Sequence, residues 1–147
     1  MNGAVNADEI LAQWRAQEAT VRERMKTAGV ARLEQVAGKT GLEFLNGMLA
    51  GEFPYPPIAD TLDFALVEVG FGRAVFQGRP LMRHYNPLGS VHGGWFATLL
   101  DSALGCAVHT TMPAGKSYTT AEARMTGPDG KLYAHASTTC FIFDTPP

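Results

Sequence analysis

The sequence predicts an α+β domain in which an antiparallel sheet curls around one buried helix. The stretch from Trp95 to Val108 is apolar or small on almost every side, so a helix there lacks a polar face and should be buried. It is too short to span a membrane. Strand-like alternation precedes this stretch from Thr61 and follows it from Ser117. Strands, a single buried helix and further strands give the α+β class.

Two capping patterns predict helices in the first third of the chain. Asn6, followed three residues later by Glu9, resembles a capping box and predicts a helix that Gly29 closes. Thr40 and Glu43 repeat the pattern and predict a second, shorter helix. We interpret this region as an accessory layer packed on the outside of the domain.

A proline-rich run, Pro54–Pro57, predicts a stiff linker without helix or central strand. We therefore divide the chain into a helical extension with its linker, residues 1–57, and a sheet-and-helix domain, residues 58–147.

Turn residues separate the predicted strands of the second part. The turn at 70–72 joins two strands into a hairpin, and 113–115 forms a turn after the buried helix. Residues 117–125 form the next strand, and the Gly-Pro-Asp-Gly sequence at 127–130 is a reverse-turn signal. Residues 132–143 form the last strand.

Composition limits the function classes. With 147 residues, the chain is long enough for one domain with a real core. The net charge of -2 and the absence of a Lys/Arg cluster argue against nucleic acid or a membrane surface as partner. The first residues lack the pattern of a signal peptide, so we expect a cytoplasmic protein. Cys106 and Cys140 are far apart in apolar segments and are predicted to be reduced packing residues.

Residues at the start of the buried helix and on it predict a catalytic site. Gly93 and Gly94 lack a Cβ, so a ligand can approach their N–H groups, and the first turn of a helix favours an anion or a developing oxyanion. The amide of Asn86 could donate to the same oxygen. Asp101 supplies a carboxylate in apolar surroundings, where desolvation would raise its pKa.

The spacing of these groups predicts a homodimer. Gly93 and Asp101 are eight positions apart, about 12 Å along a helix, so one chain cannot bring both to a single carbonyl carbon. A second copy with its helix antiparallel would place one Gly93 against the other Asp101. This arrangement gives an obligate two-fold dimer with two composite sites, provided that both groups act on one substrate.

The sequence Asn-Pro-Leu-Gly-Ser-Val-His-Gly-Gly at 86–94, followed by Leu-Leu-Asp-Ser at 99–102, resembles the signature of hotdog-fold acyl-CoA thioesterases of the PaaI type. The resemblance implies that a sheet wraps a central helix and that two units join as a homodimer or a dimer of dimers. It implies that Asp101 is the base or nucleophile, and that the Gly93 N–H and Asn86 polarise a thioester carbonyl. His92 and Gly94 would support the binding turn, and Thr120 or Thr119 would help to place water. It implies no cofactor.

The chain departs from this family after the central helix. About three dozen residues, enough for two strands, are absent at Thr120/Ala121, so the expected sheet is narrower than the family's. A thioester hydrolase acting on an acyl- or aryl-CoA is the first interpretation. A catalytically weak acyl-CoA-binding protein and a hotdog hydratase are the alternatives.

Several residues also have purely structural interpretations. Asp101 could be a hydrogen-bonded structural carboxylate, Asn86 a turn residue, and the glycine pair a site of close packing. No metal site is expected, because the four histidines lack ligand spacing. The serine at 90 is out of place for a nucleophile elbow.

Overall fold

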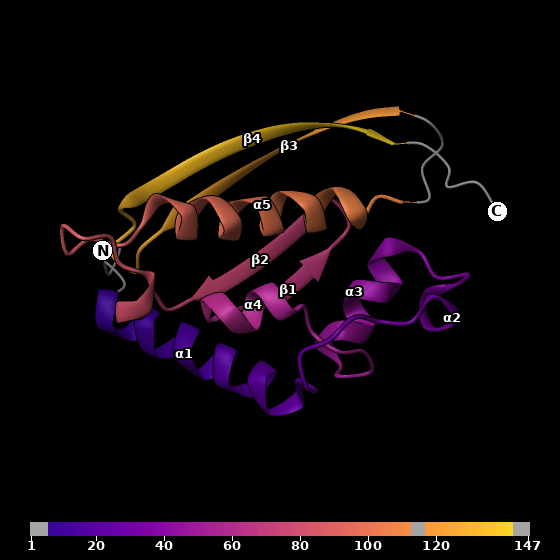
Figure 1. Cartoon of the computed structure of the whole chain (residues 1–147), viewed down its shortest axis with the longest axis horizontal. Helices are drawn as coiled ribbons and strands as arrows, with labels where there is room; N and C mark the ends of the chain where they lie inside the picture. Colours follow the sequence, from indigo (N-terminus) through magenta and orange to yellow (C-terminus); the bar gives the residue numbers. More distant parts are fainter. Residues whose placement is uncertain (1–5, 113–116, 143–147) are drawn as a thin grey trace, which may run out of the picture.

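The computed structural model describes residues 6–112 and 117–142. Helices make up most of the first half, then a β-hairpin, a long helix and a second hairpin follow (Figure 1). The elements in chain order are α1 (Ala7–Arg24), α2 (Leu33–Val36), α3 (Gly41–Leu49), α4 (Pro57–Leu62), β1 (Phe64–Gly70), β2 (Arg73–Gly78), the 3-10 turn η1 (Met82–His84), α5 (Gly93–His109), β3 (Ser117–Thr126) and β4 (Leu132–Ile142).

The helix α5 runs between the two hairpins (Figure 1). The strands β1 and β2 pair antiparallel from Phe64–Gly78 to Gly70–Arg73, and β3 and β4 pair antiparallel from Ser117–Ile142 to Thr126–Leu132. In the described residues the hairpins form two separate two-stranded sheets. The predicted α+β class with antiparallel strands around a helix is confirmed. The strands were expected to form one sheet, and that part of the prediction was wrong.

Each hairpin packs on its own part of α5. Phe64, only 1% exposed, lies with Trp95 and Leu99 in one apolar cluster, and the Trp95 Nε1–H donates to the carbonyl of Leu62 at 2.8 Å. Leu100 and Leu104 form the second cluster, against alanines of β3 and β4. Full burial of one such large side chain contributes roughly 1.5–3 kcal/mol, so these clusters hold α5 to both hairpins.

One stripe of α5 remains exposed, which corrects the prediction of a helix buried all round. Gly93, Ala97, Asp101 and Gly105 are exposed and recur at every fourth position, so they follow one side of the helix. The small residues on this stripe resemble core residues in sequence, but no described element of the chain covers them. Asp101 is therefore at the surface of the single chain and not in its interior.

The N-terminal helices agree only in part with the predicted boundaries. The side chain of Asn6 caps α1 as expected, but α1 ends at Arg24, because Met25 is already extended, and not near Gly29. The capping box of Thr40 and Glu43 at the start of α3 is confirmed.

Helix α4 was not predicted, since Pro57 was assigned to the linker. Proline fits the first position of a helix, where its missing N–H is not needed, and α4 begins with it. The division at 57/58, which falls inside α4, stays a prediction.

The turn predictions have mixed outcomes. The turn between β1 and β2 is confirmed and contains Gly72, with φ +70°. The turn between β3 and β4 is also confirmed, and in it the Gly130 N–H donates to the Gly127 carbonyl. The predicted turn at 113–115 and the end of the last strand at 143 lie outside the described residues.

Candidate active site

The loop before α5 is organised by Asn86. Its Oδ1 accepts the N–H groups of Leu88 at 2.9 Å and Ser90 at 3.2 Å, and its Nδ2 donates to Ser90 Oγ at 2.8 Å. Gly89, at φ +80°, completes the tight turn. Asn86 therefore has a structural role in this loop, and one N–H of its amide remains to donate elsewhere.

His92 caps α5. Its Nδ1 accepts the Gly94 N–H at 2.9 Å, and its carbonyl accepts the Trp95 N–H at 3.0 Å. The His92 N–H donates to the carbonyl of His84 at 2.8 Å. Because Nδ1 is the acceptor, the proton of the neutral ring lies on Nε2.

This capping leaves one donor of the first turn free. The first four N–H groups of a helix have no acceptor inside the helix. Here His92, Gly94 and Trp95 have acceptors, whereas the N–H of Gly93 has none among the described residues. Gly93 is thus the backbone donor at the positive end of the α5 dipole that is available to an anionic group.

The surroundings of Gly93 are open. A Cβ placed on Gly93 would meet no atom within 4 Å, and its φ is not in the left-handed region. Neither close packing nor backbone conformation within the chain therefore requires glycine at this position. Gly94 differs, because a Cβ there would lie 3.0 Å from the His92 ring that caps the helix.

Asp101 is the acidic group on the same exposed stripe of α5. The hydroxyls of Thr98 and Ser102 donate to carbonyls one turn earlier in the helix. Asp101 has no hydrogen bond or ion pair with any described residue, so the interpretation as a structural, hydrogen-bonded carboxylate has no partner in the single chain. Its charge acts on Cys106, as described below.

One chain does not bring Gly93 and Asp101 together. Both lie on the unbroken helix α5, which keeps them about 12 Å apart along its axis. The structure thus places Asn86, His92 and Gly93 at one end of the stripe and Asp101 two turns away.

Thr120 lies on β3 opposite Thr139 of β4, and its side chain is exposed. It makes no described hydrogen bond with Asn86, Gly93 or Asp101, so its predicted role in placing water stays a prediction. The side chain of Thr119 is outside the described part of the structure.

His84 supports the site and was not singled out from the sequence. Its buried ring accepts the Leu81 N–H at 3.0 Å, stacks on Trp95, and its carbonyl holds the N–H of His92. A histidine in a polar loop carries no periodic signal, so the sequence alone gave no reason to expect its burial.

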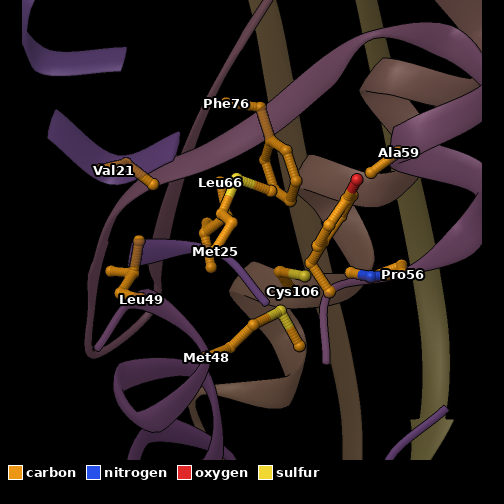
Figure 2. Close-up of a pocket in the computed structure, with 10 residues that line it drawn as sticks. Val21, Met25, Met48, Leu49, Pro56, Ala59, Leu66, Phe76 and Cys106 are labelled. Atoms are coloured by element: carbon orange, nitrogen blue, oxygen red, sulfur yellow. The ribbon is translucent and has the colours of Figure 1, made fainter. Parts of the chain in front are cut away.

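Cys106 borders a small apolar cavity of about 50 Å³ on the other side of α5 (Figure 2). Met25 and Met48 of the N-terminal layer line it together with Phe76 of β2. Burial, and then the nearby charge of Asp101, raise the pKa of the Cys106 thiol to about 11. This thiol is therefore protonated at neutral pH and is a packing residue, as predicted.

Comparison with known proteins identifies the same region. The model of the thioesterase superfamily matches residues 88–126, from the loop before α5 to the end of β3. No curated protein matches the chain significantly. A solved structure from Ralstonia eutropha JMP134, named as a candidate thioesterase related to phenylacetic acid degradation, is similar with a TM-score of 0.52.

That structure is 24% identical to this chain, and the match covers 67% of this chain and 99% of the other. At this identity the likeness supports the fold, which is the hotdog fold. The predicted hotdog fold is thereby confirmed, and the match of residues 88–126 to the thioesterase superfamily agrees with the predicted resemblance. None of the described helices is both long and apolar enough to cross a membrane.

Proposed function

We propose that this chain, which has the hotdog fold and carries a thioesterase-superfamily region, hydrolyses thioesters of coenzyme A. The acyl or aryl group would be bound at a site shared by two copies of the chain. The observation that carries this proposal is the N–H of Gly93 at the start of α5, which has no acceptor among the described residues. Gly93 is exposed and lies on the same stripe as Asp101.

The free N–H of Gly93 would polarise the thioester carbonyl. Attack on a thioester carbonyl places negative charge on its oxygen, and a fixed N–H at a helix N-terminus stabilises that charge. The remaining N–H of the Asn86 amide would be the second donor. His92 would act through Gly94, because its cap fixes the first turn from which the Gly93 N–H projects.

Asp101 would supply the attacking oxygen. Its carboxylate either removes a proton from water that attacks the carbonyl carbon, or attacks that carbon itself and forms an anhydride that water then cleaves. In both routes the thiol of coenzyme A leaves with a proton, and the products are a carboxylate and a free thiol. Thr120 would help to hold the water.

A two-fold dimer would assemble the site from both copies. If Gly93 of one chain faces Asp101 of its partner in an antiparallel contact, then Ala97, midway between them, lies at the two-fold axis. A small side chain at that position allows the two α5 helices to approach closely. The contact would also cover Asp101 and supply the desolvation that one chain lacks. Two such dimers could pair further into a tetramer.

The experiment is thiol release from a panel of acyl- and aryl-coenzyme A thioesters. The Asp101→Asn variant keeps the size of the side chain but removes the base, and the Asp101→Ala variant removes both. We expect both variants to lose nearly all activity while the exposed position leaves folding unchanged. Equal rates in all three proteins would refute the hydrolase.

The division of the sheet favours a second candidate, an acyl-CoA-binding protein with little catalytic power. Two separate hairpins hold α5 less rigidly than one continuous sheet would, and a loosely held site loses catalysis before it loses binding. Binding of acyl-coenzyme A by the wild-type chain without thiol release would select this candidate.

A further inference from the structure

His84 is the only buried residue among the four histidines of the chain, with 6% of its surface exposed. It lies at the end of the 3-10 turn η1, before the loop that leads to α5. The proposed hydrolysis does not use its ring. A buried polar ring is normally held by hydrogen bonds, and the partners of this ring show what it does.

The hydrogen bonds of the His84 ring determine its tautomer. Nδ1 lies 3.0 Å from the backbone nitrogen of Leu81, whose N–H can only donate, so Nδ1 accepts. The neutral ring therefore carries its proton on Nε2, which donates to the carbonyl of Thr61 at 3.2 Å. The Nε of Arg83 is 3.1 Å from the same Nε2, but a protonated ring nitrogen cannot accept its N–H. His84 thus joins η1 to the end of α4, 23 positions earlier in the chain.

Trp95 of α5 binds the same end of α4. Its ring stacks on the His84 ring, with the centroids 6.4 Å apart, and its indole N–H donates to the carbonyl of Leu62 at 2.8 Å. The last carbonyls of a helix have no partner inside it, and the two rings bind two successive ones, those of Thr61 and Leu62. Because Ala59 anchors α4 in the apolar cluster around Phe64, both rings are held against a fixed element.

The same two residues hold the peptide bond that carries the Gly93 N–H. The carbonyl of His84 accepts the His92 N–H at 2.8 Å, and the carbonyl of His92 accepts the Trp95 N–H at 3.0 Å. The peptide planes on both sides of the His92 Cα are thereby fixed. In a planar trans peptide the N–H points opposite to the C=O. Since the His92 carbonyl points toward Trp95, the Gly93 N–H points away from the helix.

We propose that His84 is a positioning residue that orients the Gly93 N–H toward the thioester carbonyl. Its side chain fixes the backbone of residue 84, and the carbonyl of that residue then fixes His92. The hydrogen bond to Thr61 carries this effect, because it connects the ring to another element, whereas Leu81 is only three positions away. This inference rests on the proposed function, in which the Gly93 N–H stabilises the developing oxyanion.

The test compares two matched variants of the full chain, His84→Gln and His84→Asn. The amide nitrogen of glutamine can take the place of Nε2 and donate to Thr61. Asparagine reaches only the place of Nδ1, so it keeps the hydrogen bond to Leu81 and loses the one to Thr61. Thiol release from acyl-coenzyme A thioesters gives kcat and KM. Hydrogen exchange followed by NMR gives the protection of the His92 N–H, and this measurement does not depend on activity.

We expect His84→Asn to lower kcat by about tenfold to a hundredfold, because the Gly93 N–H is retained but misdirected. KM should hardly change, since this N–H acts mainly in the transition state. The His92 N–H should exchange faster in His84→Asn than in the wild type. His84→Gln should retain most of the wild-type kcat and the protection of the His92 N–H.

Leu45→Ala is the control for a general loss of stability. Leu45 is a core residue of α3 with 3% of its surface exposed, so its truncation should lower the free energy of unfolding. The kcat of the folded Leu45→Ala protein should equal that of the wild type. A loss of kcat in His84→Asn alone is then not an effect of stability. If His84→Asn does not fold, His84→Phe takes its place, since phenylalanine keeps a ring beside Trp95 but cannot donate to Thr61.

Three results would overturn the proposal. These are an unchanged kcat in His84→Asn, an equal loss of kcat in His84→Asn and His84→Gln, and an unchanged exchange rate of the His92 N–H in His84→Asn. If the wild-type chain releases no thiol, the proposed function fails. The exchange rates of the His92 N–H then decide by themselves whether His84 fixes the first turn of α5, so the two failures are distinguishable.

Discussion

Replacing Gly93 with proline should remove the oxyanion donor and leave the helix intact. Proline has no N–H, and Gly93 is the first residue of α5, the position that tolerates proline best. The preceding residue, His92, has φ -65° and ψ 137°, which is the extended conformation that a following proline requires. The other N–H groups of the first turn keep their acceptors.

The expected loss follows from the role of a single oxyanion donor. Removal of one such donor typically lowers turnover by about 10²–10³, or about 2.7–4 kcal/mol of transition-state stabilisation. The free energy of unfolding should hardly change, because the lost N–H has no acceptor among the described residues and no atom lies within 4 Å of an added Cβ.

The matched control is Gly93→Ala, which adds the Cβ but retains the N–H. Thiol release by Gly93→Pro should be far below that of Gly93→Ala, while urea unfolding gives similar stability for both. Equal activity of the two variants would refute the assignment of the Gly93 N–H. A large loss of stability in Gly93→Pro alone would refute the conclusion that the Gly93 N–H has no acceptor within the chain.

The same variant tests whether the site is shared. In a composite site, Gly93→Pro and Asp101→Asn damage different copies, so a heterodimer of the two keeps one intact site. Mixing and reassociating the two inactive proteins in equal amounts should restore about a quarter of wild-type activity. No restoration of activity, with heterodimers demonstrated by mass, would refute the composite site.

The remaining predictions concern the dimer contact, the buried thiol and an N-terminal cap. Ala97→Glu should give an inactive monomer, because two carboxylates would meet at the two-fold axis; sedimentation measures the oligomeric state and thiol release measures the activity. The control Ala12→Glu, on the exposed side of α1, should change neither the oligomeric state nor the activity. Cys106 should react with iodoacetamide about a hundredfold more slowly than an ordinary thiol near neutral pH, since its pKa of about 11 lowers the thiolate fraction. The rate of alkylation is measured by peptide mapping with mass spectrometry, and a normal rate would contradict the burial of Cys106. Hydrogen bonds from Thr40 hold the pKa of Glu43 below its usual range, so the stability that Glu43 contributes is complete above the unfolded pKa and is lost as the pH falls through the folded pKa. Urea unfolding of Glu43→Gln should lack this acid dependence; an unchanged pH profile would exclude the contribution.

Local features of this protein were predictable from its sequence. The capping box of Thr40 and Glu43, the Gly72 turn and the position of α5 depend on residues close together in the chain. Their hydrogen bonds and apolar periodicity act over one or two turns, so the sequence shows them directly. The end of α1 and the start of α4 were missed because a glycine and a proline have several uses at helix ends.

The motif residues were also found from the sequence, but their environments were not. The sequence alone determined which groups lie on α5 and how far apart they are, because helical geometry fixes the distance between Gly93 and Asp101. The exposure of Asp101, the use of the Gly94 N–H by His92 and the separation of the two hairpins were decided only by the tertiary structure. Burial and backbone pairing depend on elements distant in the chain, and no local pattern reports which of these are present to cover a given face.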